Sequence, residues 1–392
     1  MLQSIMRGYF RTNRSKPPYR VMHLASGDLW AGAEVQLYHL ASYLNNRAEL
    51  ELLVVVLNPG ELQRRLSAAG VAVKVIDESQ HGFLRLLQLL LGIGRDFQPD
   101  IIHTHRQKEN LLGSLVSLVL LGSRSLRTVH GRDEHLPRWS QFVKRLRRAT
   151  DRWVGRWLQE RIVCVSAELK EALSAVYPDH KLVVIANGVD VAAVRSAATS
   201  STLALPVEPV KVAFIGRMVP VKRIDLFVEI ARLAGQQYPG QYLFYAIGSG
   251  PNLESAKQIA DDYGLDNLVF TGFRKDSLRW LAAMDRLCVV SDHEGLPMVV
   301  LEAMALKVPV VARKVGGIGR VLDNGAAGNL IESADPQQFV NLLAQLSSSS
   351  GAVDKQVMMA WQRVNQEYSA ETMADQYCQV YCSLFPSVER TS

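Results

Sequence analysis

The sequence predicts an α/β protein with two doubly wound, Rossmann-like domains in tandem. At 392 residues, 48% of them hydrophobic, the chain is too long for one ordinary domain and apolar enough to bury two cores. Short β-branched runs alternate with amphipathic stretches from Tyr19 onward, which is typical of βα units around a parallel sheet. This alternation is interrupted at 191–206, a stretch of mostly small and polar residues whose last residue is a proline, which indicates a domain boundary.

The N-terminal domain is predicted at 19–190, after a basic tail at 1–18. The apolar positions between its predicted strands recur with helical spacing. In chain order, the predicted strands contain VMHL, LLVVVL, VAVKVI, DIIH, LRTVH, RIVCVS and KLVVIANGVD. Because helical stretches separate the first of these strands, a parallel sheet is the expected result.

The C-terminal domain is predicted at 207–370, after a linker at 191–206. It repeats the alternation through VKVAFIG, YLFYAIG, NLVFTG and LCVVS. The apolar residues of its first helix fall at i, i+3, i+4 and i+7 and so form one buried stripe, made of Ile224, Phe227, Val228 and Ala231. Residues 371–392 are predicted to form a helix that packs back toward the N-terminal domain. Such sheets bind ligands at the carboxyl ends of their strands, so we expect a cleft between the two domains.

The composition excludes several other classes of protein. No apolar run reaches the length of a membrane-spanning helix, and the N-terminus lacks the apolar segment of a signal peptide. The four cysteines have neither disulfide nor metal-ligand spacing. We therefore expect a cytoplasmic protein without a disulfide framework.

Two cations follow the first strand of the C-terminal domain, in FIGRMVPVKR at 214–223. Arg217 lies on the loop, and Lys222 lies where a helix begins and its backbone N–H groups already favour an anion. A diphosphate fits this arrangement, since arginine offers a planar fork and lysine a mobile charge. Taken alone, the segment is equally consistent with two surface cations.

Two glutamates stand on either side of seven uncharged residues in SDHEGLPMVVLEAMA. Glu294 is expected on a loop and Glu302 more than a turn inside the following helix, roughly 10 Å away if the intervening turns are helical. This separation excludes a shared proton and favours separate contacts with hydroxyl groups, because a carboxylate accepts from two O–H donors. In isolation the pair would be read as a helix-cap acid and a surface acid. The preceding GSGP loop lacks the full G-x-G-x-x-G pattern, so a nicotinamide-dependent dehydrogenase is set aside.

Five motifs occur in a specific order: GRMVPVK, GSGP, NLVFTGF, SDHEGLPMVVLEAMA and VPVVARKVGGI. In order and spacing they resemble the C-terminal domain of family 4 glycosyltransferases, retaining enzymes with the two-domain GT-B fold. The N-terminal domain is similar to that family too, with ASGDLWAGAEVQLYHLA as its glycine loop, IIHTH as its strand-end histidines, RTVHG as its active-site histidine and IANGVD as its domain-linking turn. The resemblance covers about residues 19–385.

The resemblance implies roles for the residues already singled out. Arg217 and Lys222 would hold the donor diphosphate, and Glu302 would bind the ribose hydroxyls. Glu294 would face the donor sugar, near the backbone amides of Gly295 and Leu296. Charge on the leaving diphosphate would be stabilised chiefly by the two cations. The implied route is a front-face displacement in which the diphosphate receives the acceptor's proton.

The resemblance also implies roles in three other loops. Gly32 would let the N-terminal loop approach the phosphates, and His130 would touch the transferred sugar. Phe273 and Arg274 would lie beside the base. The implied catalytic residues are Glu294, His130, Arg217 and Lys222. The sequence has no Asp-x-Asp pair, so neither metal nor cofactor is expected.

Positive charge is concentrated at 1–20 and 137–161, which hold net charges of +5 and +6. Tryptophans recur among the arginines of the second segment, which therefore either lies in an anionic membrane interface or packs its apolar stripe on the sheet. We favour the membrane, because lipid-linked acceptors are frequent in the resembling family. The predicted membrane-facing residues are Trp139, Lys144, Arg145, Arg147, Arg148 and Arg152. The N-terminal tail either adds to this attachment or is a disordered, solvated segment.

The sequence thus predicts a hexosyltransferase of envelope polysaccharide, lipopolysaccharide or glycolipid assembly. Its expected partners are a nucleotide-sugar donor, a glycan or lipid-linked acceptor and the cytoplasmic face of the inner membrane, with no nucleic acid. Two alternatives stay open: a donor-binding partner subunit without turnover, and another GT-B enzyme such as a sugar-nucleotide epimerase.

Four residues depart from the family pattern. Ala31 replaces a glycine, and GGIGR at 316–320 places Gly319 and Arg320 where the family usually has Pro and Glu. Lys307 stands where a glycine would end the helix, which predicts a left-handed residue that costs about 1 kcal/mol.

Overall fold

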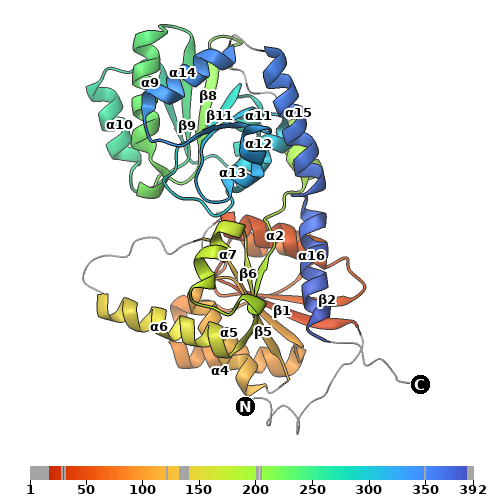
Figure 1. The fold of residues 1–392 in the computed structure, drawn as a ribbon. Helices are drawn as coiled ribbons and strands as arrows, with labels where there is room; N and C mark the ends of the chain where they lie inside the picture. The colour runs from red at the N-terminus through yellow and green to blue at the C-terminus, as the bar shows by residue number, and fades with distance from the viewer. Residues whose placement is uncertain are drawn as a thin grey trace. The chain divides into compact units, whose positions relative to one another are not determined.

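The structure, a computed structural model, describes residues 17–27, 30, 32–120, 122–131, 141–199, 203, 205–347 and 350–385. At 141–148 and 350 it describes the backbone alone. The chain folds into two compact units: unit 1 combines the residues up to Gly188 with those from Ala370 onward, and unit 2 is Val189–Ser369 (Figure 1). Of the helix predicted at 371–392, the structure shows a helix at Ala370–Ser383 in the same unit as the N-terminal residues, and 386–392 lie outside the described residues.

Unit 1 is built around a parallel sheet with the strand order β3-β2-β1-β4-β5-β6-β7. The strands are β1 (Tyr19–Ala25), β2 (Leu50–Val56), β3 (Ala72–Val75), β4 (Ile101–Thr104), β5 (Arg124–Val129), β6 (Gln159–Cys164) and β7 (Leu182–Val184). The helices are α2 (Gly32–Leu44), α3 (Glu61–Ala68), α4 (Phe83–Phe97), α5 (Gln107–Val119), α6 (Gln141–Trp157), α7 (Ala167–Ser174) and α16 (Ala370–Ser383), with short 3₁₀ turns η1 (Glu78–Gln80) and η3 (Asp179–Lys181).

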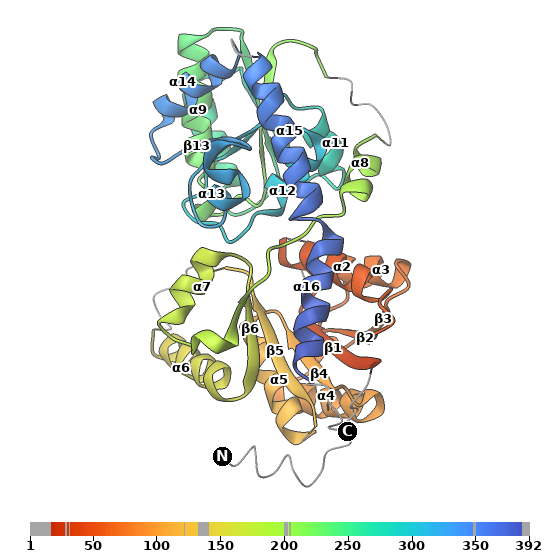
Figure 2. The same ribbon diagram turned by 45° about the vertical axis from the view of Figure 1, so that its right-hand side comes forward.

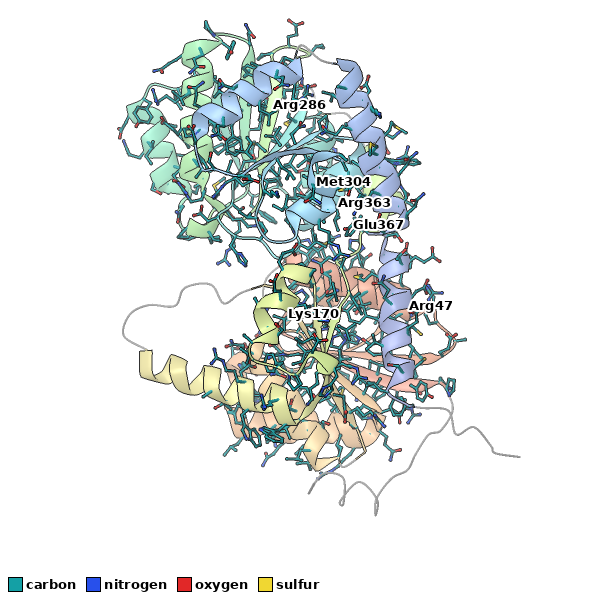
Figure 3. The ribbon with its side chains drawn as sticks, viewed as in Figure 1. Arg47, Lys170, Arg286, Met304, Arg363 and Glu367 are labelled. Carbon is teal, nitrogen blue, oxygen red and sulfur yellow. The ribbon has the colours of Figure 1, made fainter. Side chains whose placement is uncertain are left out.

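Helices cover both faces of this sheet because both faces of its central strands are apolar. Helices α2, α3 and α16 pack on one face, and α4 and α5 pack on the other. Helix α16 packs against α2, and Asp375 of α16 pairs with Arg47, which follows α2 (labelled in Figure 3), with nitrogen and oxygen 2.6 Å apart. The chain's last described helix is thus an integral part of the core of unit 1.

Unit 2 repeats the design with a parallel sheet in the order β10-β9-β8-β11-β12-β13. The strands are β8 (Val210–Ile215), β9 (Tyr242–Ile247), β10 (Leu268–Gly272), β11 (Arg286–Val289), β12 (Val310–Arg313) and β13 (Asn329–Ile331). The helices are α8 (Val191–Thr199), α9 (Ile224–Gln237), α10 (Leu253–Asp262), α11 (Ser277–Ala282), α12 (Met298–Leu306), α13 (Ile318–Val321), α14 (Pro336–Ser347) and α15 (Ser350–Gln366), with 3₁₀ turns η4 (Pro220–Lys222) and η5 (Asp323–Gly325).

Two details of unit 2 bear on the sequence predictions. The predicted stripe of α9 is confirmed, since all four of its residues are buried. Most side chains of α12 are buried, because α8, α11 and α15 pack against this helix (Figure 2). The segment at 191–206 contains helix α8, which packs on α11 and α12 within unit 2.

The strand order of each sheet reverses at one point. In unit 1 the chain moves outward in both directions from the β1–β4 pair, and in unit 2 from the β8–β11 pair. At such a point the loops after the two strands diverge to opposite faces and leave a crevice at the carboxyl end of the sheet. Binding sites are therefore expected at the ends of β1 and β4 and at the ends of β8 and β11.

Helix α6 carries the basic amphipathic segment predicted at 137–161. Of the predicted membrane-facing residues, Trp139 and the side chains of Lys144, Arg145, Arg147 and Arg148 lie outside the described residues. The described end of the helix buries Val154 and exposes Arg152, Trp153 and Trp157, the two tryptophans by 56% and 61%. Within the described ranges, none of the helices combines the length and apolarity that crossing a bilayer requires.

Candidate functional site

The loops after β8 and β11 meet through an ion pair between Lys222 and Glu294. Lys222 ends the 3₁₀ turn η4, and its Nζ lies 2.5 Å from Oε1 of Glu294. The hydroxyl of Ser291 donates to the same oxygen at 2.6 Å. Glu294 is only 8% exposed, so the pair lies largely out of water, where such a charge-assisted contact is strong. No described residue hydrogen-bonds the second carboxylate oxygen, Oε2.

A second set of contacts fixes the same two loops from the outside. The backbone N–H of Asp292 donates to the carbonyl of Val221 at 2.8 Å. The Asp292 carboxylate binds Arg223, whose Nη1 lies 3.1 Å away, and also Arg313 from the end of β12. Sequence reasoning missed these supporting residues, although Asp292 directly precedes the expected site in SDHEG.

Glycines allow neighbouring loops to approach the site. Gly316 has φ of +51°, and a Cβ there would stand 1.7 Å from the carbonyl oxygen of Glu294. Beside it, the N–H of Gly317 donates to the carbonyl of Gly295 at 2.9 Å. Gly248 in the GSGP loop likewise has φ of +142°, and a Cβ there would stand 1.9 Å from the carbonyl oxygen of Gly216. These approaches need glycine, because any side chain would collide with backbone.

Arg217 and Glu302 are the two predicted donor ligands without protein partners. Arg217 is exposed, and its guanidinium has no hydrogen bond or ion pair with another described residue. The Glu302 carboxylate is partly exposed and equally unpartnered within the described chain. Burial among protein atoms raises the pKa of Glu302 to about 7, because desolvation disfavours its charged form. Both groups are free to bind a ligand.

The remaining predicted ligands of unit 2 lie on two loops. Phe273 is 58% exposed just after β10, and the guanidinium of Arg274 lies 5.1 Å from the ring centroid of Trp280. Leu296 is buried, and the Gly295 carbonyl is engaged by Gly317. An exposed aromatic ring at a strand end is a suitable stacking surface for a base.

The departure at GGIGR forms helix α13, which α15 holds in place. Gly319 is buried and Arg320 is exposed. From α15, Arg363 donates to the carbonyls of Val321 and Arg320 at 3.1 Å each and also pairs with Glu367 (Figure 3). The loop thus has a defined shape without the proline and glutamate of the family pattern.

In unit 1, Gly32 begins α2 and His130 follows β5. Glu34 in the first turn of α2 binds Arg106, which precedes α5. His130 is flanked by further histidines: its Nε2 lies 3.3 Å from Nδ1 of His105. The other nitrogen of His130, Nδ1, is buried and has no protein partner among the described residues.

Three further histidines surround the strand-order reversal of unit 1. His23 on β1 is register partner to His103 on β4, and His105 follows two residues later on the same sheet face. All three are buried. Sequence reasoning attached no role to His23, and the visible signal was a histidine inside an otherwise apolar strand.

The histidines of this cluster are neutral at physiological pH. Burial lowers the pKa of His23 to about 3, and burial together with the nearby Arg106 lowers the pKa of His130 to about 4. The pKa values of His103 and His105 are also well below the ordinary value, first because of burial and then because a charge there would be repelled by neighbouring histidines and, for His105, by Arg106. Each ring therefore carries one proton.

Within the described residues, His23, His103 and His105 form a group whose ligand atoms lie within 4.8 Å of one another, close enough for a metal ion. All six of their ring nitrogens, however, have hydrogen-bond partners in the protein. No free lone pair converges on a common point, so the geometry is that of a hydrogen-bonded network and not of a preformed metal site.

Comparison with known proteins assigns both units. The family described as Glycosyltransferase Family 4 matches residues 30–193, and that described as Glycosyl transferases group 1 matches residues 209–349. The 2-deoxystreptamine N-acetyl-D-glucosaminyltransferase of Streptomyces fradiae is 25% identical over 89% of this chain and 90% of its own length. The UDP-Gal:alpha-D-GlcNAc-diphosphoundecaprenol alpha-1,3-galactosyltransferase of Escherichia coli is 27% identical over 63% of this chain and 66% of its own.

Solved structures share the fold of this chain. HepE from Anabaena, crystallised in complex with UDP, superposes with a TM-score of 0.79 and 21% identity over 93% of this chain and all of HepE. A glycosyltransferase from Rickettsia africae superposes with a TM-score of 0.76 and 18% identity over 95% of this chain and 99% of its own. The chain therefore belongs to glycosyltransferase family 4 of the group 1 glycosyltransferases and has the GT-B fold.

Proposed function

We propose that the protein transfers a hexose from a nucleotide-sugar donor to an envelope glycan or lipid-linked acceptor, with retention of anomeric configuration. The observation that carries this proposal is the grouping of Lys222 and Glu294 where the strand order of unit 2 reverses, on the loop that also holds Arg217. Two cations on the loop after β8 suit a diphosphate, and a carboxylate beside them suits sugar hydroxyls.

In this proposal the two oxygens of Glu294 have different tasks. Oε1 is occupied by Lys222 and Ser291, which fixes the side chain. Oε2 is left to accept from hydroxyls of the donor sugar. The same ion pair holds the Lys222 ammonium where it can reach the diphosphate, with Arg217 as the second cation.

The reaction proceeds by front-face displacement. The bond between the anomeric carbon and the diphosphate breaks while the acceptor hydroxyl attacks from the same face, and its proton passes to the leaving diphosphate. Arg217 and Lys222 stabilise the charge that develops on this leaving group, which is the largest contribution the site offers. His130 of unit 1 contacts the transferred sugar, and Glu302 binds the ribose. Gly32 permits close approach of its loop to the phosphates.

The base of the donor is proposed to be uracil, with Phe273 and Arg274 beside it. HepE, a structural relative, was crystallised in complex with UDP, and the E. coli galactosyltransferase is named for the donor UDP-Gal. A thermal-shift panel of UDP, GDP and ADP sugars tests this, because a ligand bound only by the folded state raises the melting temperature. We expect UDP sugars to give the largest rise, and a larger rise with GDP or ADP sugars would contradict the choice of base.

The catalytic role of Glu294 is tested by Glu294→Gln. We expect loss of transfer with the fold preserved, because the glutamine side chain keeps the volume of glutamate but carries no negative charge to form an ion pair with the Lys222 ammonium. Glu254→Gln on α10 is the matched control, since Glu254 pairs with Lys257 at 2.9 Å on the surface of the same unit. Undiminished turnover in Glu294→Gln would rule out the assigned role. Donor binding without any turnover in the unaltered protein would instead identify a partner subunit.

We further propose that α6 attaches the protein to an anionic membrane surface, where a lipid-linked acceptor resides. The support is the exposed face of Arg152, Trp153, Arg156 and Trp157. Tryptophans favour the interface between water and lipid, and arginines are attracted to anionic headgroups.

Vesicle sedimentation tests this attachment. The unaltered protein should bind vesicles containing anionic lipid at low salt, and Arg152→Ala with Arg156→Ala should weaken binding by about 1 kcal/mol per charge. Lys275→Ala with Lys355→Ala removes two exposed charges from unit 2 and serves as the control. Equal binding by both double variants would eliminate α6 as the attachment site.

A further inference from the structure

We propose that seven side chains of unit 1 form one hydrogen-bonded chain through which Tyr381 and Tyr377 of α16 fix the tautomer of His130, so that its Nδ1 presents an N–H to a sugar hydroxyl. Only the naming of the sugar hydroxyl rests on the proposed function. The two tyrosines act as positioning residues, because they act on His130 through other groups.

Every link of this chain is a short contact between ring nitrogens and hydroxyls. From His130 it runs Nε2 to His105 Nδ1 at 3.3 Å, His105 Nε2 to His23 Nδ1 at 3.0 Å and His23 Nε2 to the Tyr381 hydroxyl at 3.2 Å. It continues from Tyr381 to His103 Nδ1 at 2.6 Å, from His103 Nε2 to the Thr128 hydroxyl at 2.9 Å and from Thr128 to the Tyr377 hydroxyl at 2.7 Å.

The number of protons makes this chain cooperative. Each neutral imidazole and each hydroxyl contributes one mobile proton, so seven groups supply seven protons for the six links just described. One proton is left over. Either all bonds point toward His130, and its Nδ1 carries the extra proton, or all point toward Tyr377, and Nδ1 is bare. A change of direction inside the chain sets two donors or two acceptors face to face, or makes the Tyr381 or Thr128 hydroxyl accept from both neighbours, which leaves the proton of that buried hydroxyl without an acceptor among the described residues.

The far end of the chain selects between these two states. Among the described residues, the buried Tyr377 hydroxyl has a hydrogen-bond contact with Thr128 at 2.7 Å. The Gln36 amide oxygen is buried without a partner, and the Gln36 amide nitrogen donates to the Met373 sulfur at 3.4 Å, so Gln36 does not take the Tyr377 proton. A Tyr377 proton that points away from Thr128 would be buried without an acceptor, so Tyr377 donates to Thr128 and every following bond points the same way. The result is an N–H at Nδ1 of His130, the buried atom that has no protein partner.

This arrangement would give the transferase a neutral donor with one defined direction. A protonated imidazolium would also donate, but burial disfavours it. Because the chain ends on α16, the last described helix takes part in setting the chemistry of His130, which lies far from it in sequence.

The test is ¹⁵N NMR of protein labelled at histidine, since the ¹⁵N chemical shift separates N–H from bare ring nitrogens. We expect the Nδ1–H tautomer of His130 in the unaltered protein. Tyr381→Phe keeps the aromatic ring but breaks two links, which leaves three histidines with three protons for two links, so His130 should populate both tautomers. Tyr377→Phe frees the end of the chain and should have the same effect. Tyr177→Phe is the control, because it removes a buried hydroxyl that binds Arg127 at 2.6 Å outside the chain.

Turnover gives a second readout. Tyr381→Phe should lower kcat by about tenfold or more, as a wrong tautomer does elsewhere, while KM for the donor stays within about twofold. A bare Nδ1 in the unaltered protein, or the same tautomer in all variants, would overturn the inference. Stoichiometric Zn²⁺ binding that His23→Asn abolishes would overturn it as well. Absence of transfer by the unaltered protein would contradict the proposed function alone, because the NMR result does not depend on turnover.

Discussion

At the scale of single residues, the site of unit 2 is defined by which polar groups already have partners. Lys222 is held by Glu294, whereas Arg217 and Glu302 have no hydrogen-bond partner in the described chain. A carboxylate that is only partly exposed and has no hydrogen-bond partner in the protein loses part of its hydration without compensation unless a ligand binds it. The cost of leaving Glu302 in this state is the physical basis for assigning it to a ligand.

The raised pKa of Glu302 predicts a pH-dependent affinity for the donor. With a pKa of about 7, much of Glu302 is protonated at pH 6, and two ribose hydroxyls prefer the carboxylate. Affinity for a nucleotide sugar should therefore rise between pH 6 and 8, by at most about tenfold per unit below the pKa. Calorimetric titration checks this, and Glu302→Gln should bind more weakly with a flat profile. A variant that keeps the wild-type slope would show that another group titrates.

The position of Gly316 predicts that a side chain there lowers donor affinity by a steric clash, and this effect can be separated from the effect of backbone strain. Gly316→Ala would place a Cβ against the Glu294 carbonyl and displace the loop, so donor affinity should fall by about tenfold or more. Gly240→Ala is the control, because Gly240 also has positive φ, +73°, but a Cβ there would meet no atom within 4 Å. Isothermal titration and thermal melting of both variants separate the two effects. Equal losses of affinity would mean that strain alone is responsible.

At the scale of elements, α12 sets the distance between the two glutamates and ends as the sequence predicts. Lys307 at its C-terminus is left-handed, with φ of 60° and ψ of 32°, which confirms the expectation drawn from the missing glycine. The Val308 N–H closes the helix by donating to the Ala303 carbonyl at 2.9 Å. The Lys307 ammonium lies 4.9 Å from the ring centroid of Trp361, and this cation–π contact offsets part of the backbone strain at Lys307.

The left-handed backbone of Lys307 predicts that two substitutions at this position differ in their effect on stability. Lys307→Gly relieves the left-handed strain, whereas Lys307→Ala keeps it, and both lose the contact with Trp361. The glycine variant should thus be more stable than the alanine variant by about 1 kcal/mol. Denaturant unfolding measures the difference. Equal stability would imply that the helix end relaxes its backbone when the lysine is removed.

The elements also show why the histidine cluster was hard to predict. Tandem βα units, the α9 stripe and the end of α12 depend on neighbours within a few residues, and such patterns are visible in a sequence. The contacts of the cluster join residues that are 82, 278 and 358 positions apart. No local pattern encodes which histidine meets which tyrosine, because α16 reaches the sheet only when unit 1 has folded.

At the scale of the whole molecule, the two units should respond to pH with opposite sign. The four histidines of the cluster in unit 1, His23, His103, His105 and His130, accept protons near pH 6.5 when unfolded, but His23 and His130 accept them only near pH 3 to 4 when folded. Acid therefore favours the unfolded state of unit 1 below pH 6.5, by about 1.4 kcal/mol per pH unit for each histidine. Glu302 in unit 2 has a raised pKa, so its neutral folded form is favoured by acid and disfavoured as pH rises from 4.5 to about 7.

Hydrogen exchange measured by mass spectrometry checks this difference, with intrinsic exchange rates corrected for pH. Between pH 6.5 and 4.5, peptides from the sheet of unit 1 should lose protection before those of unit 2. His103→Asn, which removes one buried imidazole, should reduce the acid sensitivity even where it lowers stability at pH 7. Simultaneous loss of protection in both units would show that the histidines do not control the acid transition.

The sequence by itself determined the family, the two α/β units and the loops that carry the charged residues, because these follow from local periodicity and from motifs of fixed spacing. Only the tertiary structure decided that Lys222 pairs with Glu294, that Asp292 braces their loops and that four histidines join two tyrosines of α16 in one chain. The physical reason is that hydrogen bonds and ion pairs act over a few ångströms between residues that are far apart in sequence. Folding of the two sheets, and not the order of residues, brings those groups within reach.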